Sequence, residues 1–181
     1  MKTWKTLPGK MAYEPREDSF LLLSFIKKYA SGSVLDMGCG FGVLAKEAMK
    51  YSKDVLAADI DKEAVEHCKK QGINAVKSNL FSNIKNKFDL IMFNPPYLPA
   101  DERESIKDAI ALAGGRKGNE IIERFLKDAK KHLNKNGKML IIASSLSGDA
   151  EGLFKKYGYK FKMLREEKFF FERIKLYLLK K

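Results

Sequence analysis

"SVLDMGCGFG", residues 33–42, decides the fold, because it joins an apolar strand to three closely spaced glycines. Gly38, Gly40 and Gly42 follow the strand and precede a helical pattern that begins at Val43. A turn of this kind lets a ligand approach the backbone at points where a Cβ atom would collide with it. The stretch predicts a nucleotide-like ligand at the end of a buried strand. An ordinary tight strand-to-helix turn is the alternative.

The rest of the chain repeats short apolar runs, turns and amphipathic stretches, a rhythm typical of a parallel sheet covered by helices on both faces. The last part of the chain, residues 159–181, predicts two strands around a polar turn at 165–168, as an antiparallel hairpin on one edge of the sheet. We therefore expect an α/β, doubly wound, mostly parallel sheet of six or seven strands, in a single domain of residues 1–181. Other strands are expected at residues 33–38, 54–60, 73–78, 87–94 and 138–145. Helices are expected at residues 17–30, 43–51, 62–71, 119–133 and 147–158. Asn136 and Gly137 are expected to stop the helix at 119–133.

The composition narrows the class of protein. Of the 181 residues 45% are hydrophobic and 32% charged, and no apolar run approaches the length of a membrane span. The first ten residues lack an apolar core followed by a small-residue cleavage site, so nothing marks the chain for export. Cys39 and Cys68 are the only cysteines and form no C-x-x-C pair, so we expect no metal site. These features predict a soluble, cytoplasmic protein with no contact to a membrane.

The net charge of +12, from 35 Lys and Arg against 23 Asp and Glu, favours an anionic partner. RNA, or a protein that works on the ribosome, would qualify. The alternative is that lysine-rich helix faces only keep the protein in solution. Charge alone does not choose between the two.

Two acids narrow the choice of ligand. Asp36 lies two residues before Gly38, where a carboxylate would repel a pyrophosphate and suits a cation. Asp59 ends the second strand, a position from which a carboxylate reaches ribose hydroxyls. Asp61 is expected to cap the next helix and leave Asp59 free. A ligand with adenine, ribose and a positively charged amino-acid end is S-adenosylmethionine, which the pattern favours over NAD. Capping of a helix or loop is the alternative for both acids.

The third strand ends in "KSNLF", residues 77–81, and strand ends of a doubly wound sheet converge on the ligand crevice. Asn79 is therefore a candidate for a hydrogen bond to the adenine amine. A turn-forming asparagine is the alternative.

The fourth strand runs into "NPPY", residues 94–97, at the same crevice. An amide nitrogen or aromatic amine is a poor nucleophile, and a general base helps little when no accessible proton pKa exists. Positioning helps, together with acceptors that draw off the positive charge developing on the nitrogen. The side-chain oxygen of Asn94 and the carbonyl of Pro95 are the predicted acceptors, Pro95 and Pro96 make the turn rigid, and Tyr97 offers a flat face for stacking. A proline-terminated strand with an ordinary turn is the alternative.

"DMGCGFG", "AADID", "NPPY" and "AGGRKGNEIIERFL" together resemble the HemK-type protein glutamine methyltransferases, and "YEPREDSFLLL" is similar to their short archaeal and eukaryotic release-factor branch. The resemblance runs from about Tyr13 to the last strand. It implies a class I, Rossmann-like methyltransferase fold with seven strands and S-adenosylmethionine as methyl donor. It also implies methyl transfer to the side-chain amide of the glutamine in the Gly-Gly-Gln motif of a peptide chain release factor.

The resemblance implies roles for particular residues. Asp36 would meet the amino group of the donor's methionine part, Asp59 the ribose, and Asn79 with Leu80 the adenine. Asn79 stands where an acid is usual, a departure that would weaken adenine binding. Helix capping is the alternative for Ser19. The residues placed at the donor are Ser19, Asp36, Gly38, Gly40, Gly42, Asp59, Ile60, Asn79, Leu80 and Asn94, and those placed at the substrate glutamine are Asn94, Pro95, Pro96 and Tyr97.

The N-terminal helical substrate domain of bacterial members is not expected, so the resemblance implies a separate docking protein, a small zinc-binding activator. The aromatic run at residues 169–171 is a candidate docking edge, with a buried strand as the alternative. Two other functions stay open. An adenine amine of RNA or DNA would present a similar planar nitrogen to residues 94–97, and a donor-binding or RNA-binding subunit without catalysis would keep the same fold.

Overall fold

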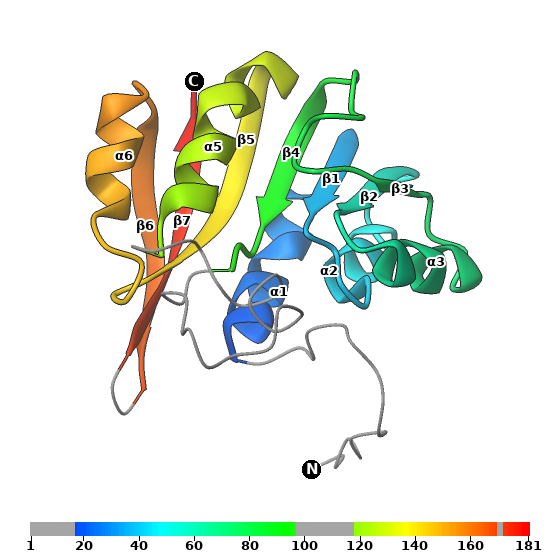
Figure 1. The fold of residues 1–181 in the computed structure, drawn as a ribbon, viewed down its shortest axis with the longest axis horizontal. Coiled ribbons are helices and arrows are strands. Elements are labelled where there is room, and N and C mark those ends of the chain that lie inside the picture. The colour runs from blue at the N-terminus through cyan, green and yellow to red at the C-terminus, as the bar shows by residue number, and fades with distance from the viewer. Residues whose placement is uncertain (1–16, 97–117, 170–171) are drawn as a thin grey trace.

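The computed structural model describes residues 17–96, 118–169 and 172–181. These residues form a seven-stranded sheet in the order β3-β2-β1-β4-β5-β7-β6 (Figure 1). Neighbouring strands from β3 to β5 pair in parallel, whereas β7 pairs antiparallel with both β5 and β6. The predicted α/β class and the C-terminal hairpin are confirmed. The strands are β1 Ser33–Met37, β2 Asp54–Asp59, β3 Ala75–Lys77, β4 Phe88–Phe93, β5 Leu133–Ser144, β6 Lys160–Lys168 and β7 Arg173–Lys180.

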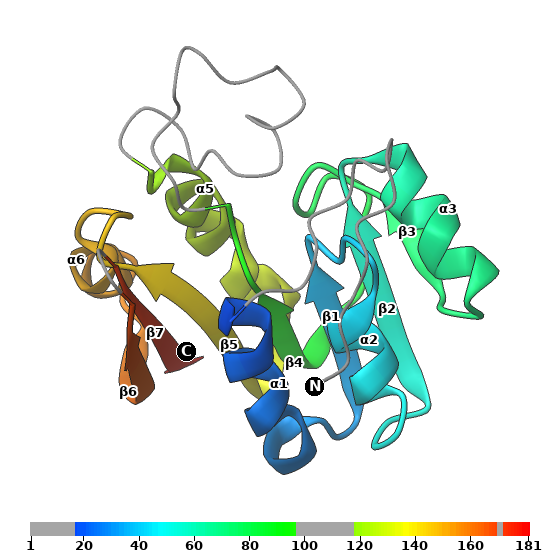
Figure 2. The same ribbon diagram turned by 90° about the horizontal axis from the view of Figure 1, so that it is seen from below.

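Helices cover both faces of the sheet. α1 (Glu17–Tyr29), α2 (Val43–Ala48) and α3 (Lys62–Lys70) bury their apolar sides in one core cluster. α5 (Glu120–Ala129) and α6 (Ala150–Lys156) pack into the second cluster, on the other face. Figure 2 shows α1 and α5 on opposite sides of the sheet. The carboxyl ends of β1, β2 and β4 therefore open between two helical layers.

Both faces of the central strands are buried, and the sequence of β4 shows why. Leu90 and Met92 point into the first core cluster, and Ile91 and Phe93 into the second. A strand that is covered on both faces has apolar residues at most positions, which explains why β4 lacks polar alternation from Leu90 to Phe93. The same requirement makes the first polar residue after Phe93 conspicuous, and that residue is Asn94.

The prediction for the helix at 119–133 is wrong at its end. α5 ends at Ala129, a short 3-10 turn (Lys130–His132) follows, and β5 begins at Leu133 rather than at residue 138. Asn134 donates from Nδ2 to Asp89 Oδ1 at 2.8 Å, and a Cβ atom on Gly137 would lie 2.7 Å from the carbonyl oxygen of Phe88. These contacts with β4 hold residues 133–137 as the irregular start of a strand, although Asn136 and Gly137 locally resemble a helix stop.

The turn of the C-terminal hairpin lies later than predicted. Residues 165–168 belong to β6 and pair with β7, and the chain reverses where the Phe169 N–H donates to the Glu172 carbonyl at 2.7 Å. Polar residues can stay in β6 because it is an exposed edge strand, where Lys175 lies 3.9 Å from Glu166 across the pair. Phe169 is 37% exposed and outside both strands, so the buried-strand alternative is wrong for it. Phe170 and Phe171 lie outside the described residues.

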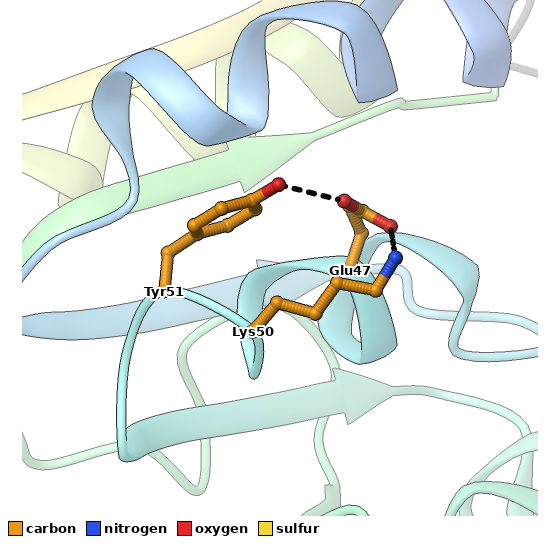
Figure 3. A network of polar contacts seen from close by, with 3 residues as sticks. All are labelled: Glu47, Lys50 and Tyr51. Carbon is orange, nitrogen blue, oxygen red and sulfur yellow. Dashed lines mark hydrogen bonds and ion pairs between the residues drawn. The ribbon is translucent and has the colours of Figure 1, made fainter.

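Glu47, Lys50 and Tyr51 form a polar network on the surface where α2 ends (Figure 3). Glu47 accepts hydrogen bonds from Lys50 Nζ at 2.6 Å and from the Tyr51 hydroxyl at 3.3 Å. Because α2 begins next to the glycine turn, this network lies at the opposite end of the helix from the turn. Among the described residues, no helix combines the length and the apolar character that crossing a membrane requires.

Candidate active site

The glycine turn leaves β1 and is fastened to β2. The backbone N–H groups of Gly38 and Cys39 both donate to the Ala58 carbonyl, at 2.7 and 3.1 Å. Gly38 has a φ of +68°, in the left-handed region that favours glycine. A Cβ atom there would lie 3.5 Å from the Phe93 ring and 4.0 Å from the Asn94 carbonyl oxygen, which are ordinary contacts. The backbone conformation therefore explains this glycine without reference to a ligand.

Gly42 has a packing role. It also has a positive φ, +74°, and a Cβ atom there would lie 2.7 Å from Ile73 Cδ1 and 2.8 Å from Cys68 Sγ. The sequence suggested that a ligand excludes a side chain at all three glycines. At Gly42 the structure supplies a different cause, the close approach of α3 and the residues that follow it.

Asp59 holds the turn in place. Its Oδ2 accepts from the Gly40 N–H at 2.9 Å, and its Oδ1 accepts from the Asp61 N–H at 2.9 Å. Asp61 caps α3 by accepting from the Glu63 N–H, as predicted. Asp59 therefore does not cap the helix, and although it binds two backbone N–H groups, each of its carboxylate oxygens keeps a lone pair for a ligand hydroxyl. Burial raises the pKa of Asp59, and the N–H groups of Asp61 and Gly40 oppose that rise.

Asp36 is completely buried in β1 below the turn. Its Oδ2 accepts from the Ala45 N–H at 2.9 Å, whereas its Oδ1 has no hydrogen-bond partner within the described part of the chain. Burial raises the pKa of Asp36 to about 7; the Ala45 N–H lowers it and the charge of Asp59 raises it further. A buried carboxylate oxygen without a partner lacks a cation or donor, so this site suits the ammonium group of an amino acid.

Asn94 stands next to the glycine turn. Met37 pairs with Phe93, so Gly38 and Asn94 are the next residues on neighbouring strands, and a Cβ atom on Gly38 would lie 4.0 Å from the Asn94 carbonyl oxygen. Asn94 Nδ2 donates to Ser19 Oγ at 3.3 Å. Its Oδ1 is buried and, among residues 17–96, 118–169 and 172–181, accepts no hydrogen bond. Pro95 is buried and Pro96 partly buried, and the predicted Tyr97 lies outside the described residues.

Asn79 and Leu80 follow β3, the strand beside β2. Asn79 Oδ1 accepts from Arg124 Nη2 of α5 at 3.1 Å. Leu80 has a φ of +51°, unusual for a residue with a side chain, and its carbonyl accepts from the Ser78 hydroxyl at 2.6 Å. Ile60, directly after Asp59, is 46% exposed, and an apolar side chain beside a carboxylate suits a base joined to a ribose.

Three contacts of the site have no signal in the sequence. Ser19 bonds Asn94, Arg124 bonds Asn79, and the thiol sulfurs of Cys39 and Cys68 lie 3.5 Å apart, both buried. The partners are separated by 75, 45 and 29 residues. Spacing within one element does not reveal such pairs, so only the fold brings them together.

The strand order, the glycine turn after β1, the acids of β1 and β2 and the Asn-Pro-Pro turn after β4 define a class I methyltransferase. Its methyl donor is S-adenosylmethionine. The chain belongs to the methyltransferase small domain family, whose family model matches residues 14–171.

Two groups of curated relatives differ in how much of their length they share with this chain. A Methanocaldococcus jannaschii protein, provisionally named a protein N5-glutamine methyltransferase, is 37% identical over 173 residues, 90% of this chain and 88% of its own length. The ribosomal RNA small subunit methyltransferase C of Serratia proteamaculans is 33% identical over 150 residues, 78% of this chain. This chain covers only 39% of that second protein.

Solved structures share the fold. A chain of the E. cuniculi Mtq2–Trm112 complex, described as responsible for the methylation of the translation termination factor eRF1, matches with a TM-score of 0.77 at 26% identity. That match covers 95% of this chain and 99% of the other. A ribosomal protein L11 methylase from Lactobacillus delbrueckii matches with a TM-score of 0.68 at 23% identity, over 96% of this chain and 83% of its own. The second likeness concerns the fold alone.

Proposed function

We propose that the protein methylates the side-chain amide nitrogen of a glutamine, the one in the Gly-Gly-Gln motif of a peptide chain release factor. The observation that supports methyl transfer to a planar nitrogen is the buried Oδ1 of Asn94 beside the glycine turn, which has no partner in the described part of the chain. An amide N–H is a neutral donor that an amide oxygen accepts without a change in charge. The names of the Methanocaldococcus jannaschii relative and of the Mtq2–Trm112 complex support glutamine and a termination factor as the target.

The donor, when bound, supplies a methyl group activated by its sulfonium sulfur. Transfer of that methyl group to the substrate nitrogen would be direct and in line; it would leave the donor as a neutral thioether, and the methylated nitrogen would release one proton to water to become the neutral N-methyl amide. Asn94 Oδ1 and the Pro95 carbonyl accept the N–H hydrogens of the substrate, so positive charge on the nitrogen is stabilised as it develops. Pro95 and Pro96 fix these acceptors, because their rings lock the backbone. For Tyr97, which lies outside the described residues, stacking on the planar amide stays a prediction from the sequence.

At the donor, Asp36 Oδ1 receives the ammonium group of the methionine part, and the free lone pairs of Asp59 receive the ribose hydroxyls. Ile60 and Leu80 pack on the adenine, and the amide of Asn79 reads its edge. Asn79 Oδ1 accepts from Arg124 and keeps a second lone pair, so it can still accept from the adenine amine, while Asn79 Nδ2 can donate to a ring nitrogen of the adenine.

A second candidate is methylation of an adenine amine in ribosomal RNA. The net charge of +12 favours a nucleic-acid partner, and the ribosomal RNA methyltransferases of Serratia and Yersinia are 33–34% identical to this chain. This chain spans about two fifths of their length. An adenine amine also presents a planar nitrogen with N–H groups, so Asn94 alone does not separate the two substrates.

The proposed setting is the cytoplasm, where release factors meet ribosomes. We propose a small zinc-binding activator as partner, supported by the Mtq2–Trm112 complex, in which a structurally similar chain has a companion protein. The basic surface would contact the ribosome or its RNA. One catalytic domain, residues 1–181, is proposed to carry the reaction.

Incubation with S-adenosylmethionine labelled in its methyl group, with either a recombinant release factor or ribosomal RNA, tests the proposal. Label in the release factor is expected, and a Gln-to-Asn change in its Gly-Gly-Gln motif should abolish it. Label in RNA only would move the assignment to the second candidate. No label in either, with and without the activator, would contradict both.

A further inference from the structure

Asn94 has one engaged end and one open end. Its Nδ2 donates to Ser19 Oγ at 3.3 Å, and its Oδ1 is buried without a partner in the described part of the chain. The two ends of an amide have opposite hydrogen-bonding character, so a rotation of the amide by 180° would exchange a donor for an acceptor at the open position. Only the acceptor can receive an N–H of an incoming substrate.

Ser19 is placed to favour the productive orientation. A hydroxyl can accept from an amide N–H or donate to an amide oxygen, and here the Ser19 hydroxyl accepts from Asn94 Nδ2. In the observed orientation Ser19 engages the donor end of Asn94, so the acceptor end is the one left for a substrate. Without this hydroxyl, neither end of the amide has a partner in the described part of the chain, and the side chain loses the hydrogen bond that holds it in the observed orientation.

Ser19 belongs to a rigid part of the molecule. It is only 7% exposed in the first turn of α1, and its N–H donates to Asp18 Oδ1 at 2.6 Å. Leu22 and Ile26, on the next turns of the same helix, are completely buried in the core. A side chain on an anchored helix holds its partner better than one on a loop.

We propose that Ser19 is a positioning residue, which fixes the Asn94 amide with its oxygen toward the methyl-accepting nitrogen. The resemblance placed Ser19 near the methionine part of the donor, and this assignment differs, because it gives Ser19 an effect on methyl transfer through Asn94. The proposal rests on methyl transfer to a planar nitrogen at Asn94. It holds for a glutamine amide and for an adenine amine alike.

Three variants test the proposal. Ser19→Ala removes the hydroxyl, Ser19→Thr keeps it, and Ser24→Ala is the matched control. Ser24 is on the same helix and its hydroxyl donates to the Leu21 carbonyl at 2.7 Å, away from Asn94. At saturating donor, Ser19→Ala should lower kcat about tenfold, the effect of losing one orienting hydrogen bond. Ser19→Thr should restore most of the lost rate.

The donor affinity separates positioning from donor binding. Calorimetry with S-adenosylmethionine should give similar Kd values for the wild-type protein and Ser19→Ala. A tenfold weaker Kd with kcat unchanged would show that Ser19 contacts the donor, and would overturn the proposal. An equal loss of rate in Ser24→Ala would show a general effect of hydroxyl loss on α1, and would also overturn it.

A measurement without substrate keeps the test independent of the proposed function. The side-chain amide protons of Asn94 are observed by NMR in 15N-labelled protein and assigned by their absence in Asn94→Asp. In the wild type and Ser19→Thr, one amide proton should be shifted and should exchange slowly with water. In Ser19→Ala both features should be lost, and their persistence would overturn the proposal. A protein that methylates neither candidate substrate refutes the proposed function and leaves this result standing.

Discussion

Asp36 and Asn94 each keep one buried oxygen without a partner in the described part of the chain, on the neighbouring strand ends of β1 and β4. The two oxygens differ in what they can bind. The Asp36 carboxyl can become an anion and suits the ammonium group of the donor, whereas the Asn94 amide stays neutral and suits an N–H of the substrate. The two residue types therefore distinguish the side of the site that suits the methyl donor from the side that suits the methyl-accepting substrate.

Asp36 should make donor binding depend on pH. Burial raises the pKa of Asp36 in the free protein to about 7, and a bound ammonium group would lower that pKa because it favours the anion. Below about pH 7 the donor must then displace a proton, so its affinity should fall by up to about tenfold per pH unit as pH decreases from 7 to 6, and level off above 7. Calorimetry at pH 6 in buffers of different ionisation enthalpy should detect about one proton released per donor bound.

The matched variants for this experiment are Asp36→Asn and Glu47→Gln, which both replace an acid by its amide. Glu47 belongs to the surface network at the far end of α2 (Figure 3), so its variant should keep the proton release. Asp36→Asn should lose the release and bind the donor more weakly. Equal proton release in both variants would mean that another group titrates.

Asn94→Ala should impair methyl transfer more than donor binding. The variant removes an acceptor whose interaction with the substrate strengthens as charge develops, so kcat should fall by about 100-fold or more, while the donor Kd changes less than about fivefold. Asn86→Ala is the control, because Asn86 is exposed near the other end of β4. Single-turnover rates at saturating donor measure the effect. Unchanged kcat in Asn94→Ala would remove this amide from the reaction.

The sequence predicts the candidate residues of the site by type and position, and it does not predict how they are held. The turn glycines, both acids and Asn94 follow from the rule that strand ends converge at one edge of the sheet. Asp59 binds two backbone N–H groups, and Ser19 holds Asn94. These contacts depend on the folded arrangement of the elements, which no local sequence pattern reveals. Asp61 caps α3 as predicted, whereas the two backbone bonds of Asp59 had no signal in the sequence.

At the scale of elements, long apolar strands and amphipathic helices were predictable, and their ends were less so. β1, β2 and β4 lie within two residues of their expected bounds, because strands buried on both faces have a clear apolar signature. The start of β5 was missed by five residues, since contacts with Asp89 and Phe88 override a local helix-stop pattern. Tertiary contacts decide ends where the local signal is weak.

The junction of the glycine turn with α3 should be sensitive to added volume. Gly42→Ala would place a Cβ atom 2.7 Å from Ile73 Cδ1 and 2.8 Å from Cys68 Sγ, in addition to the strain of its positive φ. We expect a loss of about 2–4 kcal/mol in the free energy of unfolding, the sum of strain and overpacking. Urea denaturation without donor measures this loss.

Gly72→Ala is the control for Gly42→Ala. Gly72 also has a positive φ, +77°, but an added Cβ atom would have no neighbour within 4 Å. The Gly72 variant should therefore lose only about 1–2 kcal/mol of unfolding free energy from strain. Equal losses in the two variants would mean that the contacts with Ile73 and Cys68 relax without penalty, and that packing does not require Gly42.

At the scale of the whole molecule, the carboxyl groups of the site lower the free energy of unfolding when no donor is bound. Asp36 is buried and Asp59 is partly buried, the charge of Asp59 acts on Asp36, and burial is the largest cause of the raised pKa of each. A folded protein with such groups holds protons that its unfolded chain has already lost at the same pH. The donor's positive charge would offset this effect, so binding and stability are linked through these two carboxyl groups.

This linkage predicts that the donor-free protein loses stability as pH rises toward neutral. When the pKa of a carboxyl group is higher in the folded protein than in the unfolded chain, the unfolded chain loses the proton first as pH rises. The free energy of unfolding therefore decreases as pH rises from the ordinary pKa to the folded-state pKa. For Asp36 that interval runs from 3.8 to about 7. Urea denaturation between about pH 5 and 7 should show a decrease of up to about 1.4 kcal/mol per pH unit from this one proton, and a plateau above. Asp36→Asn should flatten the curve and Glu47→Gln should not. A wild-type stability that rises from pH 5 to 7, unchanged in Asp36→Asn, would show that Asp36 is already ionised in the folded protein.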